Sequence, residues 1–131
     1  MSESNTAGNP ISGVEWSDLR RQPGDSCHCA TAYFKPDAPM FDGHFPGDAI
    51  VPGYCLLALI LDMLQLFGHR LEFKNIHFAK FHQPVRPGDR CEVQVRLEAC
   101  SGCEWSAQGA IERRDQVVLE FSAVLEASQN G

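Results

Sequence analysis

The segment Phe41–Gly53, which reads FDGHFPGDAIVPG, holds the residues best suited to acid–base chemistry. His44 stands between Gly43 and a Phe-Pro-Gly turn, so a rigid loop could hold its imidazole beside an apolar tunnel. An imidazole titrates near neutral pH, where it is an effective base. Gly53 opens an apolar stretch, and an amide at a helix N-terminus stabilises a carbonyl oxygen that gains negative charge. The segment therefore suits removal of a proton beside a carbonyl group.

A general acid is also needed if a hydroxyl group is to leave, and Asp62 is the leading candidate. It is the only charged residue in the apolar stretch Pro52–Phe67. Burial there should raise the pKa of the carboxyl group, so that it could hold a proton for the leaving group. Equally, Asp62 could be a buried carboxylate bonded to sheet backbone. Asp42 and Asp48 flank the histidine loop and are alternative acids.

The six cysteines suggest a metal site only until their spacing is considered. Cys100 and Cys103 form a single CxxC motif, and on a strand Cys27 and Cys29 would share one face while His28 points away. Structural zinc sites need four converging ligands, so we predict no metal site, and we expect buried apolar thiols plus a turn. The histidines outside the loop have no visible partners and are expected to be structural: His28, His69, His77 and His82.

Length and composition are those of one globular domain, with 131 residues, 44% hydrophobic and 21% charged. The expected division is a flexible leader over 1–12 and a single domain over 13–131. The net charge of −6 argues against nucleic acid as a partner. Residues 69–90 carry five basic and two acidic side chains, a local charge of +3, and could steer an acidic or phosphate-bearing ligand or simply be solvated.

The polar segment Met1–Pro10 lacks a secretory signal, so we expect a cytoplasmic protein with reduced thiols. Pro52–Phe67 is apolar almost all round, but it is short for a bilayer and Asp62 interrupts it. We therefore expect no membrane span and interpret this stretch as a helix buried in the core.

The remaining elements should be strands that surround this helix. Alternating or β-rich segments predict strands at 26–34, 73–82, 90–99, 105–113 and 117–125. Ser101-Gly102 and Arg114-Asp115 would make short hairpin connections, whereas Val14–Arg21 is amphipathic and of uncertain type. One helix followed by a meander of strands predicts an α+β architecture, a curved antiparallel sheet wrapped round one long helix.

Two motifs carry a resemblance to a known family. GHFPG at 43–47 is followed by Pro52-Gly53 and the apolar helix, and PVRPGD at 84–89 follows in order. Together they resemble the beta-hydroxyacyl-acyl-carrier-protein dehydratases of fatty-acid or polyketide-type biosynthesis, over about residues 26–125. The resemblance implies the hot-dog fold, a dimer whose sheets join, and active sites at the dimer interface.

The same resemblance makes His44 the catalytic histidine and Gly53 the carbonyl-binding residue. It implies a substrate carried on phosphopantetheine, attached to an acyl carrier protein or coenzyme A, and no other cofactor. Four residues are expected to line the substrate pocket: Phe45, Pro46, Tyr54 and Ala58.

Ala58 stands where the family has its second catalytic residue, an acidic side chain. Three functions therefore remain open: a dehydratase that uses another acid, a non-catalytic subunit that pairs with an intact dehydratase, and a hot-dog acyl thioesterase. The dimer could be homotypic, or heterotypic with a second hot-dog chain.

Overall fold

The computed structural model describes residues 11–21, 26–43 and 48–128. Six strands, one α-helix and one short 3-10 helix make up this part of the chain. In order they are β1 (Val14–Arg21), β2 (Cys27–Phe34), η1 (Pro39–Phe41), α1 (Gly53–Leu66), β3 (Leu71–Phe81), β4 (Arg90–Ala99), β5 (Glu104–Arg113) and β6 (Gln116–Ala127).

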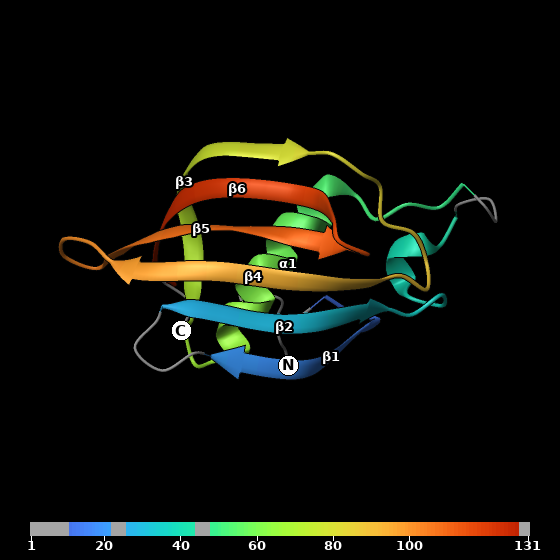
Figure 1. The fold of residues 1–131 in the computed structure, drawn as a ribbon, viewed down its shortest axis with the longest axis horizontal. Helices are drawn as coiled ribbons and strands as arrows, with labels where there is room; N and C mark the ends of the chain where they lie inside the picture. The colour runs from blue at the N-terminus through green and yellow to red at the C-terminus, as the bar shows by residue number, and fades with distance from the viewer. Residues whose placement is uncertain (1–10, 22–25, 44–47, 129–131) are drawn as a thin grey trace.

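The strands form one antiparallel sheet in the order β1-β2-β4-β5-β6-β3, which curves around α1 (Figure 1). The α+β hot-dog fold expected from the sequence is confirmed. The simple meander is wrong in one respect, because of the four strands after the helix only β4, β5 and β6 follow one another across the sheet. β3 crosses to the far edge and pairs with β6, so that the strand following the helix becomes an edge strand.

The core lies between the concave face of the sheet and α1. Strand alternation places every second side chain on that face, as in β2, where Ala30, Ala32 and Phe34 are buried. The helix supplies the other half of the core with side chains such as Leu59 and Met63, both fully buried. This contact holds the start of α1 at one fixed place along the sheet.

The helix is not buried on every side, contrary to the sequence expectation. Tyr54 is 75% exposed and Leu66 is 48% exposed, while Leu57, Ala58 and Leu61 are half-buried. The reason is geometric, since a single sheet covers only one side of a helix. No helix in the described part of the chain is long and apolar enough to cross a bilayer.

The segment of uncertain type, Val14–Arg21, is a strand with a register irregularity between Ser17 and Arg20. The predicted turn at Arg114-Asp115 is confirmed, with φ of 52° and 65° at its two residues, as a type I′ hairpin requires. Cys55 and Cys91 are buried thiols, and Cys100 and Cys103 are exposed at the turn between β4 and β5, both as expected. Cys27 and Cys29 differ from the expectation, because they are only half-buried.

Candidate active site

The residues just before α1 meet the PVRPGD motif in space. The Val51 amide, just before the helix, donates a hydrogen bond of 2.7 Å to the Val85 carbonyl oxygen in PVRPGD. The Phe34 amide at the end of β2 bonds to the Asp89 carbonyl oxygen at 3.0 Å. Arg113 on β5 bonds to the Asp89 carboxylate at 3.0 Å. Segments far apart in the sequence therefore fix the start of the helix.

A cleft of about 430 Å³ opens at this junction, between the start of α1 and the end of β3. Figure 1 shows the first turn of α1 beside the tip of the β3 arrow. The residues that line the cleft are mostly apolar: Ile50, Val51, Gly53, Leu56, Phe81, His82, Gln83 and Pro84. Such a surface suits an acyl chain better than a highly charged ligand.

Gly53 lines the cleft and begins the helix after Pro52. The amides of Cys55 and Leu56 bond back to the Pro52 carbonyl oxygen, so those of Gly53 and Tyr54 precede the first intrahelical bond. A Cβ atom at Gly53 would lie 3.1 Å from Cζ of Phe81, which is closer than most side-chain contacts. Glycine here lets the aromatic ring approach the helix N-terminus.

Of the other residues expected at the site, His44, Phe45 and Pro46 lie outside the described residues. Tyr54 and Ala58 both lie on the side of α1 that the sheet leaves open. Neither is among the described residues that line the cleft, and so their role in a substrate pocket stays a prediction.

Asp62 is buried two turns into the helix, at 7% exposure. Its Oδ2 accepts a hydrogen bond of 2.8 Å from the Ile11 amide. Burial raises the pKa of the Asp62 carboxyl group to about 6, and the Ile11 hydrogen bond opposes this rise. A carboxyl group with such a pKa can hold or release a proton near neutral pH, which is what a general acid needs. Asp62 does not belong to the described lining of the cleft.

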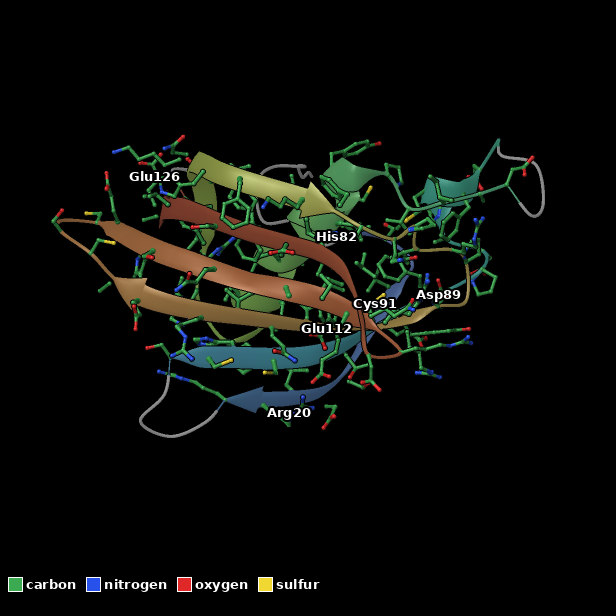
Figure 2. The ribbon with its side chains drawn as sticks, turned by 45° about the horizontal axis from the view of Figure 1, so that its top comes forward. Arg20, His82, Asp89, Cys91, Glu112 and Glu126 are labelled. Carbon is green, nitrogen blue, oxygen red and sulfur yellow. The ribbon has the colours of Figure 1, made fainter. Side chains whose placement is uncertain are left out.

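His82, which was expected from the sequence to be structural, also lies at the cleft. Figure 2 shows it at the end of β3, and it lines the same cleft as Gly53. Its Nε2 lies 2.8 Å from Oε2 of Glu120 on β6. The signal that could have pointed to it is its place two residues before Pro84, the start of PVRPGD.

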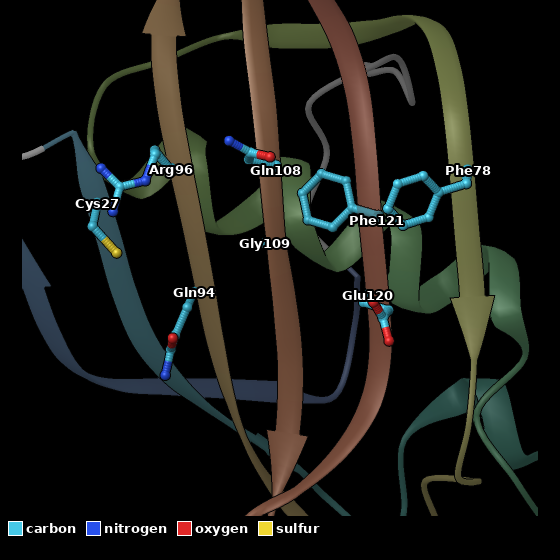
Figure 3. Close-up of a pocket in the computed structure, with 8 residues that line it drawn as sticks. All are labelled: Cys27, Phe78, Gln94, Arg96, Gln108, Gly109, Glu120 and Phe121. Carbon is cyan, nitrogen blue, oxygen red and sulfur yellow. The ribbon is translucent and has the colours of Figure 1, made fainter.

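Further cavities lie elsewhere in the described part of the chain. On the face of the sheet turned away from α1, a groove of about 350 Å³ includes Gln94, Arg96 and Gln108 among its polar lining (Figure 3). Near the end of α1, a cavity of about 420 Å³ is lined in part by His28 and His69. Within the described ranges, no three His, Cys, Asp or Glu side chains are grouped so that they could hold a metal ion.

The sequence has recognisable relatives. The family model for ApeI-like proteins, described as ApeI dehydratase, matches residues 20–119. A 3-hydroxyacyl-[acyl-carrier-protein] dehydratase FabZ from Anaeromyxobacter sp. strain K is 34% identical over 100 residues, which are 66% of this chain and 64% of the relative. The FabZ of Rhodospirillum rubrum is 30% identical over 99 residues, 66% of this chain and 62% of the relative. The matches thus span less than two thirds of these relatives.

Several solved structures have a fold similar to that of this chain. The dehydratase heterocomplex ApeI:P from Xenorhabdus doucetiae gives a TM-score of 0.64 at 20% identity, covering 90% of this chain and 98% of that one. The PaaI protein from the phenylacetic acid degradation operon of E. coli gives 0.61 at 13% identity, covering 88% and 80%. At such identities the likeness concerns the fold alone.

Proposed function

Because the chain belongs to the ApeI-like dehydratase family, we propose that it dehydrates a 3-hydroxyacyl thioester, with His44 as the base. The observation that carries the proposal is the apolar cleft where the start of the helix meets PVRPGD, with Val51 bonded to Val85 and Gly53 at the first turn. The acyl group would be carried on phosphopantetheine, attached to an acyl carrier protein or to coenzyme A. The relatives named as acyl-carrier-protein dehydratases favour the first carrier.

The helix N-terminus would polarise the substrate. A thioester carbonyl oxygen placed near the Gly53 amide gains negative charge as the α-proton leaves, and the helix dipole stabilises that charge. His44 would take the α-proton. The hydroxyl group on the β-carbon would then leave with a proton from an acid, for which Asp62 is the candidate from the sequence.

We also propose that the working form is a dimer joined through β3. This strand is an edge of the sheet, and its exposed apolar side chains include Ile76 and Phe78. The open side of α1 adds Tyr54 to the exposed apolar surface. Pairing of two β3 strands would satisfy edge backbone groups and bury part of this surface.

A second candidate function is that of a non-catalytic subunit beside an intact dehydratase. Alanine at position 58 favours it, because alanine cannot transfer a proton. A similar fold also occurs in a dehydratase described as a heterocomplex. The partner would be a second hot-dog chain with an acid at the matching helix position.

The test is to mix the purified protein with 3-hydroxyacyl thioesters of both carriers and follow enoyl product and free thiol separately. We expect enoyl product without thiol release, and no product from His44→Ala. Asp62→Asn should lower turnover by about 10²–10⁴ if Asp62 is the acid. Thiol release would instead indicate a thioesterase. Activity only beside a second hot-dog chain would establish the subunit function.

A further inference from the structure

Two free thiols lie close together at the start of β2, on the sheet face turned away from α1. The Sγ atoms of Cys27 and Cys29 are 3.8 Å apart. Strand alternation gives both side chains the same face, whereas His28 between them is buried on the opposite face. Both cysteines are half-buried, so small molecules in solution can reach a pair of thiols that already lie close to each other.

We propose that Cys27 and Cys29 form a redox site, at which a small disulfide compound such as glutathione disulfide oxidises the two thiols to one disulfide bond. Small thiols would reverse the reaction. The inference is independent of the proposed dehydratase function, because neither cysteine is among the described residues that line the cleft at the start of α1.

The backbone of β2 allows this bond but resists it. Two residues along a strand advance by about 6.8 Å, and disulfides join Cα atoms that are usually about 4.4–6.8 Å apart. The bond therefore lies at the upper limit of that range. Pairing with β1 on one side and β4 on the other keeps β2 extended. A disulfide formed under this strain is readily reduced, as a reversible site requires.

Cys27 is the thiol that a disulfide compound meets first. It lines the groove of about 350 Å³ that Figure 3 shows, whereas Cys29 is not among the described residues of that lining. Arg96 lies directly opposite Cys27 on β4, and Gln94 is a further polar residue of the groove. The groove thus offers a polar space for the small thiol that stays attached to Cys27 between the two steps of the exchange.

Cys29 is the thiol that closes the bond, and its pKa controls the rate of closure. Burial raises the pKa of the Cys29 thiol to about 11, and the hydrogen bond and charge of Cys27 add to the rise. Arg20 on β1 lowers this pKa and Glu92 on β4 raises it. Because the thiolate is the nucleophile, closure should be slow at neutral pH and faster as the pH rises.

Atoms and electrons balance in two exchange steps. The Cys27 thiol loses its proton to solvent, and its sulfur attacks one sulfur of the small disulfide. The S–S bond of that compound breaks, and one thiolate leaves with the electron pair. The Cys29 sulfur, after losing its proton, attacks the Sγ atom of Cys27, and the second thiolate leaves. The protein gives up two electrons and two protons, and the small disulfide becomes two thiols.

The test uses the full chain with Cys100→Ser and Cys103→Ser, which removes the exposed thiols at the hairpin turn. The protein is equilibrated with mixtures of glutathione and glutathione disulfide between pH 7 and pH 9, and its peptides are weighed by mass spectrometry. We expect the peptide with Cys27 and Cys29 to lose two hydrogen atoms and to regain them with dithiothreitol. A peptide that remains a dithiol or a mixed disulfide under all these conditions overturns the proposal.

Cys29→Ser in the same background is the matched control, because it leaves Cys27 in the groove without a second thiol. This variant should stop at the mixed disulfide between Cys27 and glutathione. With both thiols present, the mixed disulfide should convert to the internal disulfide about tenfold faster for each unit of pH, because the thiolate fraction of Cys29 rises tenfold per unit below its pKa. A conversion rate that does not depend on pH would contradict the assignment of Cys29 as the closing thiol.

Phenylarsine oxide tests the distance between the thiols without oxidising them. One molecule binds two thiols that lie close together and releases water. We expect one arsenic atom per chain when both thiols are present and none after washing in Cys29→Ser, since Cys55 and Cys91 are buried. If the arsenical does not bind, the close approach of the thiols is wrong and the proposal fails. If it binds but no disulfide ever forms, β2 is too rigid to close the bond and the redox assignment is wrong.

Discussion

The two ends of α1 each have histidines beside them, in opposite surroundings. At the beginning of the helix, His82 is half-exposed, lines a cleft and has a carboxylate partner. At the end, Gly68 has a φ of 95° and the His69 amide bonds to the Leu64 carbonyl oxygen, so the last turn is closed by backbone. The ring of His69 then packs against buried His28, with 5.2 Å between ring centroids.

The surroundings of buried His28 and half-buried His69 disfavour their protonated forms. Nε2 of His28 and Nε2 of His69 have no hydrogen-bond partner within the described chain. Burial lowers the pKa of both rings, and the nearby charge of Arg21 lowers both further. Residues of one type thus differ in burial and in polar partners between the two ends of one helix.

The largest expected contrast is chemical reactivity. Diethyl pyrocarbonate modifies imidazole rings that it can reach, so His82, with its side chain 41% exposed, should react much faster than His28, which is 2% exposed. If exposing His28 costs about 4 kcal/mol, its rate should be roughly a thousandfold lower. Mass spectrometry of peptides from a time course measures both rates. Equal rates would mean that the end of the helix opens freely and that the comparison does not hold.

The next effect concerns Asp62, which lies between the two ends. Its pKa of about 6 in the folded protein lies above the ordinary 3.8, so the folded state binds the proton more tightly. Stability should therefore fall as pH rises from about 4 to about 6, by about 3 kcal/mol at most. Asp62→Asn should remove this slope and be more stable at pH 7, as urea unfolding at several pH values would show.

This variant also sharpens the assignment of the acid. A gain in stability together with lost turnover would mark Asp62 as a strained functional group. A gain in stability with full turnover would mean that another group is the acid. A variant whose stability keeps the wild-type slope would show that Asp62 is not buried as a charge.

The smallest expected effect has the opposite sign and comes from the other end of the helix. Burial lowers the pKa of His28 and His69 in the folded protein. At acid pH the unfolded chain therefore binds protons at these histidines more tightly than the folded chain does. Their contribution to stability should fall as pH drops below about 6.5. His69→Phe should weaken this loss at acid pH, measured by thermal unfolding, whereas the exposed control His77→Gln should leave it unchanged.

The sequence predicted the fold well because its signals are local. The alternation in Arg90–Ala99 and the Arg114-Asp115 turn each specify their own structure. The place of β3 beside β6 could not be predicted in this way, because strand order depends on packing across the sheet. The contact between His82 and Glu120 could not be predicted for the same reason. Glu120 is distant from His82 in sequence, and only the register of β3 against β6 brings them together.

Because the Ile11 amide donates a hydrogen bond to Asp62, the pKa of this buried carboxyl group depends on whether the chain is cleaved before Ile11. A protease that cut between Pro10 and Ile11 would turn that amide into a charged α-ammonium group. The ammonium would stand beside a buried carboxylate, so a neutral hydrogen bond would become an ion pair and the pKa of Asp62 would drop. One cleavage, with no side chain altered, would thus change the protonation state of the Asp62 carboxyl group.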